Sequence, residues 1–224
     1  MTTSTAAVEL EELRPRRISS SWRAPVSLRV PTGSFVTLVT TPNQAASLFR
    51  LALGMDLPAT GSIRMLGVEP HRLRRAELRR FRRRVGSCLL PDGLMANITV
   101  RANVVLPLVF GDGLSSSDAN ERAEEVLTRF DLQEWADRRP SDLSPDTRQV
   151  AALARAVAAR PDILLLHDPL TSVPNIEAHR LLRICRDYAA TILAAVHGEE
   201  EAVCTMADAA MAWDAQGYRE LARA

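Results

Sequence analysis

A chain of 224 residues with 46% apolar side chains is long enough to bury the core of one globular domain. Its formal net charge is only +1, so the overall charge gives no reason to expect nucleic acid or another polyanion as a partner. The three cysteines are odd in number and far apart, which argues against a disulfide framework and suits a reducing compartment.

The N-terminal residues contain no apolar segment of the kind that directs secretion. Residues 1–22 are polar and mixed, and we expect them to form a tail or a short edge segment ahead of one domain over residues 23–224. No apolar run reaches the roughly 20 residues that a membrane-spanning helix requires. We therefore expect a cytoplasmic chain, which would still be able to lie against a membrane protein.

Strand and helix patterns alternate through the first third of the chain. Alternating or apolar runs predict strands at 26–30, 35–39, 61–66 and 85–90. A helix is expected over residues 45–53, ended by Gly54, and a second helical stretch, rich in arginine, over residues 72–84.

The middle of the chain is mostly helical, and the last third alternates again. Helical spacing predicts helices over 98–110, 116–130, 144–159, 175–188 and 199–207. Short apolar runs, of the kind buried in parallel sheets, predict strands at 162–166 and 191–196, with a last strand at 209–213. We therefore expect an α/β fold with a largely parallel core and a helical subdomain at about residues 91–158.

Several segments in a fixed order carry a resemblance to a known family. They are the strand–turn–helix run 35–49, the segment 99–108, Leu143-Ser144 with Arg148-Gln149 and the Ala-rich helix that follows, the run 159–169, and Val196-His197. Over about residues 25–215 the chain resembles the ATP-binding subunits of ABC transporters. The phrases around Pro107 and at 136–144 are most similar to members of lipid- and lipoprotein-handling systems (Mla, Mce and Lol types).

This resemblance implies a P-loop NTPase-like nucleotide-binding domain, with an antiparallel N-terminal β portion beside the mostly parallel sheet. It also implies partners, namely membrane permease subunits and a second ABC subunit that is either identical or different. In this family each ATP lies between the phosphate loop of one subunit and the signature motif of the other. The implied location is peripheral, on the cytoplasmic side of the inner (cell) membrane.

The phosphate loop of the family reads G-x-x-x-x-G-K-S/T, so that backbone N–H groups surround the phosphates and a lysine reaches them. The equivalent run 40–47 keeps this length but has Thr40 and Ala45 at the glycine positions and Ala46 at the lysine position. Pro42 has no N–H to donate, and all 28 basic residues of the chain are arginines. The vestigial loop comprises Asn43, Ala45, Ala46, Ser47 and Leu48.

Two interpretations of this run stay open. It is either an ordinary strand-to-helix turn or a helix N-terminus that still attracts an anion. Ser47 is retained at the position of the Mg²⁺ ligand. We assign no cofactor, and ATP with Mg²⁺ is expected to bind weakly if it binds.

The run that resembles the Walker B strand is degenerate as well. The family has Asp-Glu-Pro, in which the Asp orients Mg²⁺ through water and the Glu polarises the attacking water. Pro169 aligns His167 with the Asp and Asp168 with the Glu, whereas a slipped register would make Asp168 the metal residue and leave no base. His197 stands at the switch position, as a functional relic or as a structural histidine. The glutamine that should follow the strand is replaced by Leu90.

The signature motif of the family, L-S-G-G-Q, also departs from its pattern. Ser144 is kept, but Pro145 removes a donor, and Asp146 puts a negative charge where the γ-phosphate of the opposite subunit would lie. The aspartate of the following D-loop aligns near Pro174 and is lost. With both halves of the composite site altered, the resemblance implies a chain without ordinary ATPase activity.

Three functions remain from the sequence. The first is a non-hydrolysing ABC-type subunit of a membrane transport complex, with a structural or regulatory role and with lipid or lipoprotein as the suggested cargo. The second is an ABC ATPase with weak or atypical turnover that uses Ser47, Asp168 and His197. The third is a soluble regulatory module, or one that contacts nucleic acid, on a P-loop fold.

The segment 72–84 carries eight arginines and one acid, Glu77. It is a solvated helix, or it contacts either anionic lipid headgroups or an acidic segment of a membrane partner. Only Phe81 interleaves the arginines, which makes nucleic acid an unlikely partner, because proteins that bind single strands present several aromatic rings.

Overall fold

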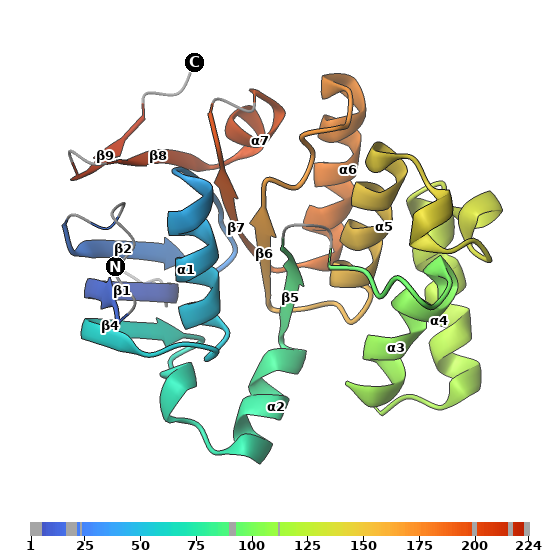
Figure 1. Ribbon diagram of the computed structural model, residues 1–224, viewed down its shortest axis with the longest axis horizontal. Helices are drawn as coiled ribbons and strands as arrows, with labels where there is room; N and C mark the ends of the chain where they lie inside the picture. Colours follow the sequence, from blue (N-terminus) through green and yellow to red (C-terminus); the bar gives the residue numbers. More distant parts are fainter. Residues whose placement is uncertain are drawn as a thin grey trace.

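The computed structural model describes residues 6–16, 22, 24–89, 93–111, 113–198, 201–214 and 217–221. It contains two separate β-sheets on one side and a group of helices on the other (Figure 1). Within these residues, no helix combines the length and the apolar character that crossing a bilayer demands.

The larger sheet has six strands in the order β5-β6-β7-β3-β8-β9. The strands are β3 (Phe35–Val39), β5 (Val85–Cys88), β6 (Ile163–His167), β7 (Thr191–Val196), β8 (Ala209–Asp214) and β9 (Gly217–Glu220). All neighbours are parallel except β9, which runs antiparallel to β8 and extends the sheet beyond the strand predicted as the last. The prediction of an α/β fold with a largely parallel core is confirmed.

The smaller sheet is antiparallel, with the order β2-β1-β4. Its strands are β1 (Ala6–Pro15), β2 (Val26–Pro31) and β4 (Pro58–Met65). The central strand β1 lies where a tail or a short edge segment was expected within residues 1–22, and it buries Val8, Leu10 and Leu13. Its alternation is broken near Glu12, where φ is +46° and the pairing register shifts on both sides. This irregularity hides the period of two by which a strand is normally recognised in a sequence.

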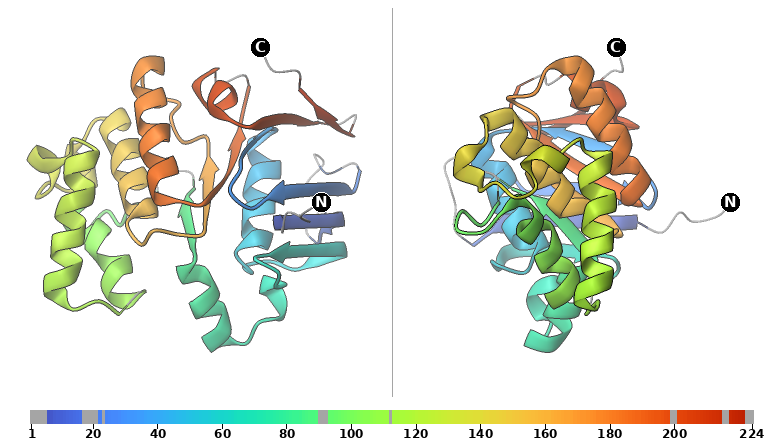
Figure 2. Two further views of the ribbon diagram at one scale, coloured as in Figure 1. Left: turned by 180° about the vertical axis from the view of Figure 1, so that it is seen from behind. Right: turned by 90° about the vertical axis from the view of Figure 1, so that its right-hand side faces the viewer.

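The helices cover both faces of the larger sheet. They are α1 (Pro42–Ala52), α2 (Arg75–Arg83), α3 (Val100–Phe110), α4 (Ser116–Arg129), α5 (Pro145–Val157), α6 (Asn175–Tyr188) and α7 (Glu201–Met206). Short 3-10 turns occupy Pro70–Arg72, Gln133–Trp135 and Pro140–Asp142. Helix α1 lies between the two sheets and buries Leu48, Phe49 and Leu51, whereas α3 and α4 stand at the far end beyond α5 (Figure 2).

The order of the strands decides which polar residues can meet. Strands β6, β7 and β3 are parallel neighbours, so their carboxyl ends lie along one edge of the sheet. Thr40 follows β3, Asp168 follows β6 and His197 follows β7. An open α/β sheet commonly places its ligand site at this edge, so the motif residues converge on the position expected for function.

Candidate functional site

Helix α1 begins three residues into the run that aligns with a phosphate loop, at Pro42. The Thr41 hydroxyl caps this helix by accepting a hydrogen bond from the Gln44 backbone N–H at 3.3 Å. The Gln44 side-chain carbonyl in turn accepts from the Thr41 N–H at 3.2 Å and from the hydroxyls of Thr40 and Thr41 at 2.9 and 2.8 Å. Most of this reciprocal capping box is shielded from solvent, since Gln44 is 1% exposed, Thr40 is 6% exposed and Thr41 is half-buried.

The closed turn offers little to a phosphate group. A phosphate-binding nest requires residues of left-handed conformation, and none of the residues from Thr40 to Ser47 has a positive φ. The N–H groups of Thr41, Gln44 and Ala45 donate within the turn, and Pro42 has none. Asn43 and Ala46 are exposed, Ser47 is half-buried and Leu48 is buried.

Gln44 is the residue that the sequence analysis missed at this site. Its position could have been found, because Thr41 and Gln44 have the spacing of a capping box, S/T-x-x-E/Q, directly before a helical pattern. The alignment with the phosphate loop drew attention instead to the lost glycines and the lost lysine.

Helix α5 begins with the same combination, a hydroxyl N-cap followed by proline at the first helical position. The Ser144 hydroxyl accepts from the Thr147 N–H at 3.4 Å and lies 2.7 Å from the Thr147 hydroxyl. A hydrogen bond from Ser144 lowers the pKa of Asp146, which keeps its carboxylate ionised at neutral pH. Ser144 and Pro145, at the start of α5, are exposed. The carboxylate of Asp146 gives this helix start a negative charge.

The other end of the signature segment is tied to the loop after β6. The Gln149 side chain donates to the Thr171 hydroxyl at 2.7 Å and accepts from the Ser172 N–H at 3.0 Å. Leu90 and Pro91 lie outside the described residues, so the predicted loss of the glutamine after β5 stays a prediction. Pro174 precedes α6 and provides no side-chain cap.

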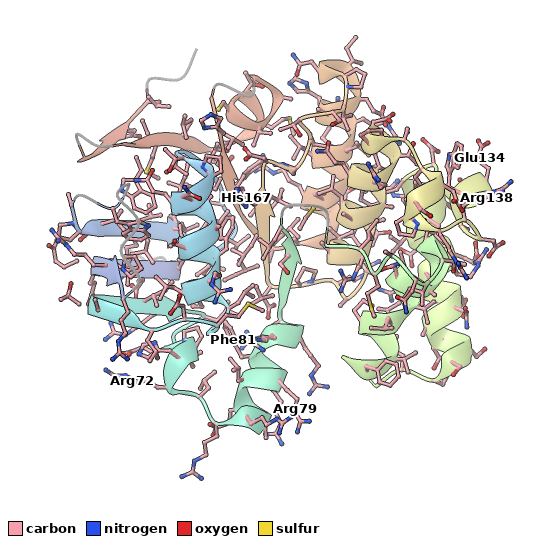
Figure 3. All side chains as sticks on the ribbon, in the orientation of Figure 1. Arg72, Arg79, Phe81, Glu134, Arg138 and His167 are labelled. Atoms are coloured by element: carbon pink, nitrogen blue, oxygen red, sulfur yellow. The ribbon has the colours of Figure 1, made fainter. Side chains whose placement is uncertain are left out.

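His167 ends β6 and points toward α1 in the centre of the molecule (Figure 3). Its ring is buried, lies edge-on to Phe49 at 6.1 Å between centroids, and has an Nε2 without a hydrogen-bond partner. Burial lowers the pKa of His167, and the negative charge of Asp168, 3.5 Å away, opposes this shift only in part. The imidazole is therefore neutral at pH 7 and is a poor partner for hydrated Mg²⁺, which prefers oxygen.

Asp168 is engaged with the backbone of the neighbouring strand. Its Oδ1 accepts from the His197 backbone N–H at 2.6 Å, and its own N–H donates to the Ala195 carbonyl at 2.9 Å. Its φ of +42° is unusual for a residue other than glycine and turns the chain sharply after β6. The structure thus brings Asp168 to the backbone of His197, while the His197 side chain is exposed.

The carboxyl edge of the larger sheet thus gathers Thr40, Asp168 and His197. Among the described residues, no three His, Cys, Asp or Glu side chains are grouped in a way that would hold a metal ion. The groups that meet are a neutral side chain, His167, which packs against Phe49 of α1, and Asp168, which is bonded to the backbone of His197.

Comparison with known proteins places this arrangement in a family. The family model described as ABC transporter matches residues 25–171. The chain is 34% identical to an uncharacterised ABC transporter ATP-binding protein of Mycobacterium tuberculosis, over 73% of this chain and 50% of the relative. It is 34% identical to methionine import ATP-binding protein MetN 1 of Pseudomonas fluorescens, over 77% of this chain and 53% of that protein.

Two further comparisons bear on size and fold. Macrolide export ATP-binding/permease protein MacB of Syntrophobacter fumaroxidans is 30% identical over 88% of this chain and 29% of its own length. The chain spans about half the length of the other two relatives. The dimeric post-hydrolysis structure of the ATP-binding cassette MJ0796, bound to ADP and Pi, shares the fold with a TM-score of 0.80 at 23% identity, covering 96% of this chain and 99% of that one. The chain belongs to the family of ABC transporter ATP-binding domains.

Proposed function

We propose that this chain is a non-hydrolysing ABC-type subunit that associates with membrane permease subunits and has a structural or regulatory role in transport. The observation that carries the proposal is the capped N-terminus of α1. There the Gln44 side-chain carbonyl accepts from the Thr41 N–H and from two threonine hydroxyls, and the N–H groups of Gln44 and Ala45 donate to Thr41. ATP does not fit this turn in the way a glycine-rich loop receives it.

Four other features support the absence of turnover. Phosphoryl transfer is catalysed almost entirely by positioning and by stabilising charge, and removing a single preorganised donor costs about 10²–10³ in rate. Here the chain has no lysine to reach the phosphates, and His167 is neutral at the metal position. Asp168 already accepts a backbone hydrogen bond, and Asp146 brings a negative charge to the signature segment.

The partners follow from the family. The names of the relatives describe an ATP-binding protein for the import of methionine and an ATP-binding/permease protein for the export of macrolides. We propose that this chain pairs with permease subunits and with a second ABC subunit, either a copy of itself or a different one. It would lie on the cytoplasmic side of the inner membrane, and the phrases around Pro107 favour lipid or lipoprotein as the cargo.

Titration of the purified chain with a slowly hydrolysed ATP analogue, with and without Mg²⁺, tests this proposal. We expect no saturation below about 1 mM, which corresponds to about 4 kcal/mol of binding free energy at most. ATP turnover is measured in parallel on the chain and on the Asp168→Asn variant, in which a neutral amide replaces the carboxylate at position 168. Turnover in the chain that is abolished by this substitution would contradict the proposal, whereas turnover equal in both proteins would indicate a contaminant.

A further inference from the structure

The charge of the chain is strongly segregated. The segment 72–84 holds eight arginines and Glu77, a formal charge of +7, whereas the whole chain carries only +1. The remaining residues therefore carry −6. Such a concentration of one sign within 13 residues produces a local positive potential that the overall charge does not reveal.

Most of this charge is available on helix α2. Arg72 and Arg84, at the two ends of the segment, are paired with Glu69 at 2.7 Å and Asp162 at 2.5 Å. Along the helix and at its N-cap, the guanidinium groups of Arg74, Arg75, Arg79 and Arg80 are exposed and form no ion pair with a carboxylate of the described residues, since Glu77 accepts only from the backbone N–H of Arg74. Together with exposed Arg83 they form what we call the arginine surface.

This surface projects from the body of the protein. Helix α2 lies at the lower extremity of the molecule in two perpendicular views, and Figure 3 shows Arg79 pointing outward while Phe81 points toward the core. Phe81 is 5% exposed and anchors the helix. The guanidinium groups of α2 are thereby held outward on a fixed element.

An apolar element adjoins the arginines. A cavity of about 550 Å³ beside α2 is lined by Arg79, Arg80, Arg83, Phe110 and Arg155 among others, and no acidic residue is among the described residues that line it. Phe110, at the end of α3, is 83% exposed, and Arg83 fixes this end by donating to the Gly111 carbonyl. Unpaired guanidinium groups next to an exposed aromatic ring suit a boundary between anionic headgroups and hydrocarbon.

We propose that the arginine surface and Phe110 bind a membrane surface that contains anionic phospholipids. Guanidinium groups bind phosphate in a bidentate manner, and the cavity admits a headgroup without a carboxylate to repel it. A projecting helix reaches a flat surface more readily than it receives a peptide segment, and a single exposed ring offers little stacking to nucleic acid. The proposal rests on the proposed function only in placing the chain next to a membrane.

Flotation of the full chain with lipid vesicles tests this inference. The vesicles are phosphatidylcholine alone, or phosphatidylcholine with about one third phosphatidylglycerol, at low and at high salt. We expect binding only to the anionic vesicles, weakened by salt. Arg79→Gln combined with Arg80→Gln should weaken it by roughly 10- to 30-fold, since each arginine near an anionic surface contributes several-fold to affinity.

The matched control is Arg138→Gln combined with Arg139→Gln, an adjacent pair of exposed arginines, of which Arg138 lies at the right-hand side of Figure 3, away from α2. It removes the same charge and should bind like the wild type. Phe110→Ser should weaken binding to the anionic vesicles but should not change how strongly this binding depends on salt. Circular dichroism confirms that each variant is folded.

Equal flotation of the two double variants would overturn the proposal, as would equal binding of the wild type to neutral vesicles. If the Arg79/Arg80 variant loses capture of an acidic permease segment, or of single-stranded DNA, but still floats with anionic vesicles, the surface recognises that partner and not lipid. Vesicle binding does not depend on ATP turnover. A failure to bind anionic vesicles would therefore leave the proposed absence of ATP hydrolysis intact. Detection of ATP hydrolysis would likewise leave the proposed membrane binding intact.

Discussion

The N-termini of α1 and α5 use the same local chemistry in different surroundings. Each helix begins with a hydroxyl N-cap followed by proline, Thr41-Pro42 in α1 and Ser144-Pro145 in α5. In α1 the cap is reciprocal and buried, and Gln44 accepts three hydrogen bonds. In α5 the cap is one-sided and exposed. We therefore expect the cap of α1, which has more hydrogen bonds and is more buried, to contribute more to the free energy of unfolding than the cap of α5.

The two helix starts also differ in charge. Around α1 the acceptor is a neutral amide that lies inside the turn, whereas α5 presents the ionised carboxylate of Asp146 outward. One start closes a place where an anion could bind, and the other repels an anion that approaches. The comparison explains why we expect structural variants to act mainly at α1 and charge variants mainly at α5.

The largest effect is expected for Gln44→Ala. The substitution leaves the Thr41 N–H and two threonine hydroxyls without their acceptor in a buried turn, which should lower the free energy of unfolding by about 2 kcal/mol. Urea denaturation measures this change. The control is Asn43→Ala at the exposed neighbouring position, which should change stability by less than about 0.5 kcal/mol. Equal effects of the two substitutions would remove the distinction between a buried and an exposed cap.

A pH-dependent effect is expected at His167, beneath α1. Burial lowers its folded-state pKa below the value of about 6.5 in an unfolded chain, so the unfolded chain takes up the proton first as pH falls. Stability should therefore decrease below about pH 6.5, by at most about 1.4 kcal/mol per pH unit, until the folded-state pKa is reached. Denaturation at several pH values should show that His167→Gln flattens this decrease, and that His197→Gln, at an exposed position, does not.

A smaller effect is expected for Ser144→Ala. The loss of an exposed N-cap typically costs about 1 kcal/mol, and the first turn of α5 retains access to water. Ser117→Ala, at an exposed helical position of α4, serves as the reference and should be close to neutral. A loss for Ser144→Ala as large as that for Gln44→Ala would show that the exposed cap matters as much as the buried one.

The smallest effect is expected for Ala46→Lys. The substitution restores the lysine of the family motif, but the new side chain would stand on a turn that Gln44 already closes. Titration with an ATP analogue and Mg²⁺ should show no gain over the wild type. The matched comparison is the double variant Ala46→Lys with Gln44→Gly, which removes the side-chain carbonyl that accepts the hydrogen bonds of the turn. Micromolar binding by the single variant would show that the cap of α1 opens without a change at Gln44.

The sequence predicted most of the fold because its elements are strongly patterned. The bounds of α6 and β7 agree with the predicted ranges 175–188 and 191–196, since both have clear periodicity and end at turns. Strand β1 was missed because its bulge breaks the alternation. It is recognised as a strand only from its pairing with β2, the next strand along the chain, and with β4, which begins only at Pro58. Strand β9 depends in the same way on pairing with β8.

At the site, residue identities were enough to show which chemical groups are missing, since no arrangement supplies a lysine that the chain does not contain. The positions and the hydrogen-bond partners of the other side chains depended on the tertiary structure. Asp168 meets the N–H of His197, 29 residues away, only because β6 and β7 are parallel neighbours. The sequence alone determined which side chains stand at the positions that align with the family motifs. Long-range strand pairing determined that Asp168 bonds to the backbone of the neighbouring strand, because buried acceptors are satisfied by the donors that the fold brings to them.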